Sequence, residues 1–156
     1  MKTGLSTPIC RAARAMPSLT AAALQACAKA IAPHKPPWLV TRIAGDLNVR
    51  IPVDTHLGNG MPIRVIWTDV IGYSICVDGY YDVSSVRVLQ SFLKPGMTFV
   101  DVGAHVGQYT LVASDLVGPC GAVHSFEPQP DTFDLLQHNV RTNHLRKVHL
   151  NKVRAG

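Results

Sequence analysis

The sequence lacks the cysteine and histidine spacings that mark metal sites and disulfide-rich proteins. Its four cysteines, Cys10, Cys27, Cys76 and Cys120, are far apart and form no Cys-x-x-Cys pair, so neither a zinc site nor a disulfide framework is indicated. The seven histidines show no His-x-x-x-His or His-x-His spacing, and no metal site is expected. Widely spaced cysteines are typical of reduced structural thiols, and we expect a cytoplasmic protein.

Long runs of one charge are also absent. The formal net charge is +5, but no run reaches five like charges, so we expect no nucleic-acid partner. A hydrophobic share of 47% with only 16% charged residues predicts a globular protein. The Ala-rich stretch Leu19–Ala32 has too few apolar residues to span a bilayer, so no stable membrane insertion is expected. It predicts a surface helix within an N-terminal helical segment, residues 1–45; a targeting segment and a helix that lies on a membrane surface are the alternatives.

Residues 46–82 have the pattern of a β-hairpin region. Residues 47–53 alternate apolar and polar side chains, as a half-buried strand does, and residues 63–67 alternate again. Gly58-Asn59-Gly60 supplies the positive φ angles of a chain reversal between them. Val70–Val77 is predicted as a third strand.

Residues 83–156 alternate helix and strand. Helices are predicted at Val83–Leu93, Val106–Val117 and Asp131–Asn143, with Asp131 as the cap of the last, and strands at Thr98–Val102, Ala122–Phe126 and Val148–Val153. The first of these strands is rich in apolar residues, which predicts burial on both faces. A βαβαβ order implies an α/β fold with a parallel sheet and right-handed crossovers.

The turn after the first of these strands is the candidate ligand site. Asp101 ends the strand, and Gly103, His105 and Gly107 follow before the next helix. Glycine lets the backbone turn sharply and approach a ligand closely, and helix starts in such sheets bind nucleotides. The turn is not the Gly-x-Gly-x-x-Gly of dinucleotide enzymes, and the Asp101 carboxylate would repel phosphates.

Glu127 is the second element of the candidate site. It follows the neighbouring strand, where a carboxylate can accept hydrogen bonds from the two hydroxyls of a ribose. A purely structural reading stays open: the glycines can serve only the turn, Asp101 can cap a helix, His105 can be a turn residue, and Glu127 can be a solvated acid.

Several short motifs together resemble the FkbM family of methyltransferases over roughly residues 79–156. The matching positions are Gly79-Tyr80-Tyr81-Asp82, Lys94-Pro95-Gly96, Val100 to Gly107, Tyr109-Thr110-Leu111, Val117-Gly118, Gly121, Phe126-Glu127-Pro128, Asn139 and Asn143-His144-Leu145. The family more commonly has glutamate at Asp82 and asparagine at His105.

The resemblance implies a partial class I methyltransferase, Rossmann-like, with S-adenosylmethionine as methyl donor and O-methylation of a sugar or secondary-metabolite hydroxyl. Asp101, Gly103 and Gly107 would line the methionine side of the cofactor, with His105 beside them, and Glu127 would hold its ribose. The acidic acceptor motif and the adenine contacts of the family come later than residue 156, so no catalytic residue is assigned. We therefore expect a truncated, inactive and poorly stable N-terminal half, residues 83–156, in which the hairpin could pair with the bare strand edge. The alternatives are a non-catalytic cofactor-binding module, an NAD(P)-linked oxidoreductase fragment, and a structural or interaction role carried by the N-terminal helix and hairpin.

Overall fold

The structure is a computed structural model that describes residues 50–153. In chain order the elements are β1 (Pro52–His56), β2 (Pro62–Ile66), α4 (Val70–Asp78), α5 (Val83–Phe92), β3 (Thr98–Val102), α6 (Gln108–Val117), β4 (Ala122–Phe126), α7 (Pro130–Thr142) and β5 (Val148–Asn151). The predicted N-terminal helix, in residues 1–45, lies outside the described residues. Among the described residues, no helix combines the length and apolar character needed to cross a membrane.

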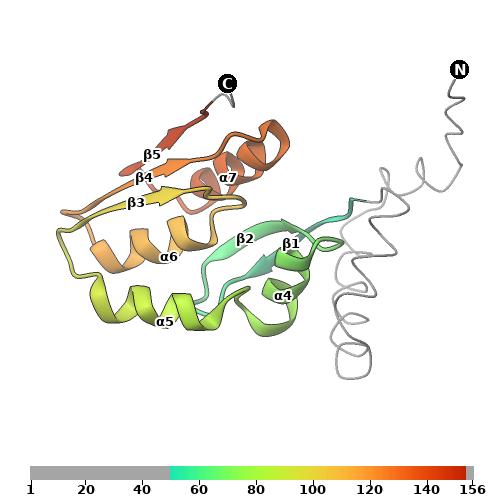
Figure 1. The fold of residues 1–156 in the computed structure, drawn as a ribbon, viewed down its shortest axis with the longest axis horizontal. Helices are drawn as coiled ribbons and strands as arrows, with labels where there is room; N and C mark the ends of the chain where they lie inside the picture. Colours follow the sequence, from blue (N-terminus) through green and yellow to red (C-terminus); the bar gives the residue numbers. More distant parts are fainter. Residues whose placement is uncertain (1–49, 154–156) are drawn as a thin grey trace, which may run out of the picture.

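The predicted parallel sheet is confirmed. Its three strands lie in the order β3-β4-β5, and both pairs are parallel. Figure 1 shows α6 between this sheet and α5. Helices can connect parallel strands only by crossing over one face of the sheet, so the carboxyl ends of β3 and β4 meet at the same edge.

The predicted hairpin is confirmed as well. β1 and β2 pair antiparallel, with Val53 opposite Val65, and form a two-stranded sheet of their own. Gly60 in the connection has a φ of 85°, which supplies the expected reversal. The hairpin does not pair with β3, so this alternative for the bare edge does not occur in residues 50–153.

The prediction of a third strand at Val70–Val77 is wrong, because this segment is helix α4. The Asp69 carboxylate accepts a hydrogen bond from the Gly72 amide at 2.6 Å and caps the helix start, and Gly79 ends it with a left-handed φ of 77°. A Cβ on Gly72 would lie 2.0 Å from the carbonyl oxygen of Ile66, so glycine lets the helix approach β2 closely. Apolar side chains surround this helix on all sides, so its sequence shows no amphipathic pattern from which a helix could be predicted.

Burial of β3 on both faces is also wrong for the described residues. Phe99 is half-buried and Asp101 buried against the helices, but Val100 and Val102 on the other face are 54% and 81% exposed. All helices that pack on the sheet in this part of the chain lie on the Asp101 face, and the free edge of β3 has no strand partner there. Within residues 50–153, β3 therefore has an exposed apolar face and an edge without a strand partner.

The core joins the hairpin to the helices beneath the sheet. Buried side chains from both parts form one cluster, which includes Val65 of β2, Ile75 of α4, Leu111 of α6 and Leu136 of α7. Each such side chain contributes roughly 1.5–3 kcal/mol when it leaves water. The hairpin therefore shares one hydrophobic core with the βαβαβ segment.

Asp131 does not cap α7, contrary to the expectation. The N-cap is Gln129, which makes no side-chain capping bond, and Pro130 starts the helix. Proline favours this position because its missing amide would have no partner there. Asp131 lies in the first turn and pairs with Arg50 at 3.0 Å on the surface.

Candidate functional site

The turn between β3 and α6 is attached to the end of β4 by two backbone hydrogen bonds. The amides of Gly103 and Ala104 donate to the carbonyl oxygen of Phe126 at 2.9 and 3.0 Å. The backbone takes positive φ angles of 81° at Gly103, 51° at His105 and 93° at Gly107. Glycine adopts such angles without steric cost, and histidine is enriched there together with asparagine. The asparagine common in the family and the histidine found here thus suit the same backbone conformation.

The two glycines of the turn have different surroundings. A Cβ on Gly107 would lie 2.6 Å from Leu136 Cδ1, so Gly107 is needed for close packing of the turn on α7. A Cβ on Gly103 would meet nothing within 4 Å. Gly103 is also exposed, so the space in front of it is open to a ligand that approaches the backbone.

Glu127 is the buried carboxylate beside this turn. It is 5% exposed, and its two oxygens accept hydrogen bonds from the amides of His105 and Gln129, each at 2.9 Å. A carboxylate has about four lone-pair positions, so each oxygen keeps the capacity for one further donor. Glu127 therefore both holds the turn and can accept hydrogen bonds from a ligand.

Asp101 lies beneath the turn, on the face of the sheet that packs on α6. The Thr110 hydroxyl donates to its carboxylate at 2.6 Å, and the Ser125 hydroxyl lies 2.7 Å from the Thr110 hydroxyl. Thr110 has one hydroxyl proton, so Ser125 is the donor in the second contact. Burial raises the pKa of Asp101, hydrogen bonds from Thr110 oppose this, and the nearby charge of Glu127 raises it further.

Gln108 is a site residue that the sequence analysis missed. It opens α6 and is 4% exposed, and its side-chain oxygen accepts a hydrogen bond from the Tyr81 amide at 2.7 Å. Its side-chain nitrogen is buried and has no hydrogen-bond partner within residues 50–153, and the same holds for Nδ1 of His105. Two buried polar atoms, one in the turn and one at the start of α6, thus lack a hydrogen-bond partner in the described part of the chain, and such atoms carry a free-energy cost.

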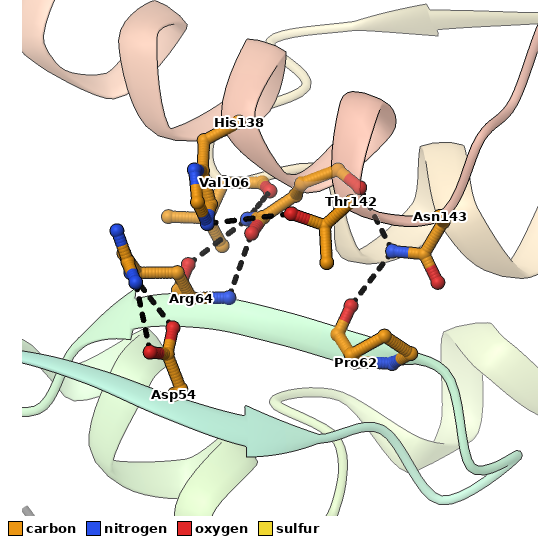
Figure 2. Close-up of polar contacts among 8 residues, drawn as sticks. Asp54, Pro62, Arg64, Val106, His138, Thr142 and Asn143 are labelled. Carbon is orange, nitrogen blue, oxygen red and sulfur yellow. Dashed lines mark hydrogen bonds and ion pairs between the residues drawn. The ribbon is translucent and has the colours of Figure 1, made fainter. Parts of the chain in front are cut away.

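Asn139 of α7 ties the hairpin to the turn. Its side chain is fully buried, accepts from the Arg64 amide at 2.7 Å, and donates to the carbonyl oxygens of Arg64 and Val106 at 2.9 and 2.8 Å. Asn143, one turn later, donates to the carbonyl oxygen of Pro62 at 2.7 Å. Figure 2 shows α7 above β2, joined to it by these contacts. The side chains of α7 therefore occupy the outer edge of β2 as a neighbouring strand would.

A hollow lies between the hairpin and α7, beside this contact. It has a volume of about 340 Å³ and is lined by β1, β2 and α7, including His56 and His138. The Asp54–Arg64 ion pair at 2.7 Å lies in its wall, and none of the turn residues 103–107 lines it. Within residues 50–153, no three His, Cys, Asp or Glu side chains are grouped as a metal ion would require.

The structure brings four of the five predicted site residues to one edge of the sheet and places the fifth beneath it. Gly103, His105 and Gly107 form the turn, and Glu127 bonds to it. The Asp101 carboxylate instead contacts Thr110. Thr110 and Asn139 appear in the family pattern, but their contacts have no local sequence signal.

The fold is α/β with a parallel sheet, and it resembles the fold of class I methyltransferases. The chain is similar to P. horikoshii TYW2, solved in complex with MeSAdo, with 19% identity over 80% of this chain and 49% of that one, at a TM-score of 0.51. It is also similar to a SAM-dependent methyltransferase from Aquifex aeolicus, with 32% identity over 46% of this chain and 38% of that one, at a TM-score of 0.42. Aeropyrum pernix fibrillarin is similar as well, with 23% identity over 46% of this chain and 32% of that one, at a TM-score of 0.38. The chain spans less than half the length of each of these proteins. No curated protein matches it.

Part of the sequence also matches a family model. Residues 101–154 match the family model of the methyltransferase FkbM domain, which confirms the resemblance over that range. The matched range includes Asp101, the glycine turn and Glu127, the groups that form the candidate site.

Proposed function

We propose that this chain binds S-adenosylmethionine at the Gly103–Gly107 turn and belongs to an enzyme that methylates a hydroxyl oxygen of a sugar or secondary metabolite. The observation that carries the proposal is the buried Glu127 carboxylate, which bonds to the turn and keeps lone pairs for further donors. The open space in front of Gly103 supports it, since a ligand can approach the backbone there.

The residues of the site fit this cofactor. Glu127 would accept hydrogen bonds from the ribose hydroxyls, Gly103 would let the cofactor lie against the backbone, and Nδ1 of His105 would gain a partner. Gly107 keeps the turn packed on α7. Asp101 would contribute indirectly, because its contact with Thr110 holds the first turn of α6 in place.

When bound, the cofactor supplies a methyl group on a positively charged sulfur. The contribution of this chain to the reaction is to hold that group in one position for an acceptor oxygen. Positioning of reactants accounts for up to about 7–11 kcal/mol of a barrier in well-oriented systems. The turn suits this role because its hydrogen bonds to Phe126 and Glu127 fix its backbone before any ligand arrives.

The proposed division of the chain places a helical segment at 1–45, the hairpin region at 46–82 and the N-terminal half of the methyltransferase domain at 83–156. We also propose a cytoplasmic location, which the widely spaced cysteines support.

Calorimetry with two ligands tests the proposal. S-adenosylhomocysteine, the demethylated cofactor, is expected to bind more tightly than NADH, because the turn lacks the third glycine that brings a pyrophosphate onto a helix start. Tighter binding of NADH would overturn the proposal in favour of an oxidoreductase. Binding of S-adenosylhomocysteine without methyl transfer to a panel of hydroxylated acceptors would favour a non-catalytic binding module.

A further inference from the structure

We propose that the surface where α7 ends and β5 begins binds an anionic lipid surface. The inference concerns a part of the molecule away from the cofactor site and does not depend on the proposed function. Residues 135–156 contain five arginine or lysine residues and no aspartate or glutamate, so their formal charge of +5 equals that of the whole chain. Residues 50–134 contain nine acidic residues and four basic ones. Within residues 50–153, an excess of positive charge is therefore found only in the last part of the chain.

The connection between α7 and β5 is short and folds back on the end of the helix. The His144 amide donates to the carbonyl oxygen of Arg141 at 3.0 Å, so the chain turns directly after the helix. Arg146 and Lys147 follow before β5 begins. Arg141 and Arg146 are exposed, and Lys147 is half-buried. We call these three cations, Arg141, Arg146 and Lys147, the basic corner.

The cations of the basic corner have no ion-pair partner within residues 50–153. The ion pairs in that part of the chain are Arg50 with Asp131 and Arg64 with Asp54. The negative end of the helix dipole favours a cation in the last turn of α7, which accounts for Arg141. It does not account for Arg146 and Lys147, because they lie beyond the helix and the effect falls off within its last turn. A local structural role therefore leaves two of the three cations unexplained.

The composition of the basic corner favours a membrane surface over a nucleic acid. Residues 135–156 contain no phenylalanine, tyrosine or tryptophan, so they offer none of these rings for a base to stack on. A lipid surface requires only clustered cations, because each lysine or arginine close to anionic headgroups adds to the attraction. The N-terminal segment has the same character, since six arginine or lysine residues precede the first acidic residue, Asp46.

A membrane at the basic corner would leave the cofactor site accessible. Lys147 directly precedes β5, which is parallel to β4, so the corner lies at the amino ends of the strands. The Gly103–Gly107 turn and Glu127 follow the carboxyl ends of β3 and β4. The two sites are therefore at opposite edges of the sheet, and the turn would face water while the corner contacts lipid.

Sedimentation of the whole chain with lipid vesicles tests the inference. Wild type is expected to bind vesicles that contain phosphatidylserine and not vesicles of phosphatidylcholine alone, and added salt should weaken the binding. The variant Arg146→Gln/Lys147→Gln removes two cations of the corner. Each cation near the surface changes the partition coefficient about fivefold, so the variant should bind roughly twenty-five-fold more weakly.

Arg50→Gln/Arg87→Gln is the matched control, because it removes the same charge from exposed positions elsewhere and should bind like wild type. Circular dichroism shows whether the variants fold; if the corner variant does not, Lys147→Gln replaces it, with an expected loss of about fivefold. Equal binding by the corner variant and the control would overturn the inference, as would wild-type binding to both kinds of vesicle alike or to neither. Binding of a labelled RNA that depends on Arg146 and Lys147, without binding to vesicles, would assign the corner to nucleic acid instead.

Discussion

Replacing Glu127 separates its two roles, the support of the turn and the binding of a ribose. Glu127→Ala removes the acceptor for the amides of His105 and Gln129, so a stability loss of about 2 kcal/mol or more is expected together with the loss of ligand contacts. Glu127→Gln keeps one acceptor oxygen and most of the shape. It loses the charge, and hydrogen bonds to a charged group contribute about 1.5–3 kcal/mol. Binding of S-adenosylhomocysteine by Glu127→Gln should therefore weaken roughly ten- to a hundred-fold.

A ligand that lacks one ribose hydroxyl shows whether the weaker binding of Glu127→Gln comes from the ribose. The 2′-deoxyribose analogue of S-adenosylhomocysteine should bind wild type more weakly than the parent ligand, whereas Glu127→Gln should bind the two ligands almost equally. Asp134→Asn, which removes a charge from the exposed side of α7, serves as the control and should behave like wild type. Calorimetry measures all the affinities. If folded Glu127→Gln still prefers the ribose ligand as strongly as wild type does, Glu127 is not its ribose ligand.

Four further predictions follow from other contacts. Asn139→Leu leaves three backbone groups without their partner and should lower the free energy of unfolding in urea by about 3 kcal/mol or more; a loss below 1 kcal/mol would contradict this. Both Gly107→Ala and Gly103→Ala should lose stability because of their positive φ angles, but Gly107→Ala should lose about 1–3 kcal/mol more through its clash with α7, whereas Gly103→Ala should also weaken S-adenosylhomocysteine binding; the reverse pattern would refute the roles given to the two glycines. Burial raises the pKa of Asp101 above 3.8, so the folded state binds the proton more tightly and stability falls as the pH rises through the raised value. Asp101→Asn should thus be more stable than wild type at neutral pH, with a gain that vanishes below the ordinary carboxyl range, and urea unfolding at several pH values measures it. Val102→Lys, on the exposed face of β3, should reduce self-association in sedimentation with little change in stability, and unchanged association would show that this face is not adhesive.

The elements with a clear period were predictable from the sequence. β3, β4 and the helices after them follow short apolar runs bounded by glycine and proline, and these signals are local. Helix α4 was not predictable, because apolar residues surround it on all sides and a single capping residue, Asp69, is a weak signal for a helix start. The exposed side of β3 was missed for a different reason. A strand made mostly of apolar residues has the same sequence pattern whether one face of the sheet is covered or both are.

Part of the candidate site was predictable from the sequence, and part of it was not. The glycine turn and Glu127 were predictable because they follow two adjacent strands whose ends must meet. Asn139 contacts Arg64, which is 75 residues earlier, and Gln108 contacts Tyr81, which is 27 residues earlier. Pairs so distant in sequence are set by tertiary packing, and one sequence carries no signal that links them.

Mapping the ligand on the backbone amides tests the central claim most directly. S-adenosylhomocysteine is added to the isotope-labelled chain, and the amide chemical shifts are followed by nuclear magnetic resonance. The account predicts the largest changes at Gly103, His105, Gln108 and the segment after Glu127, with none at His56 in the hollow between the hairpin and α7. Changes centred on that hollow, or no changes at a concentration of ligand that saturates related enzymes, would contradict the claim that the turn after β3 is a cofactor site.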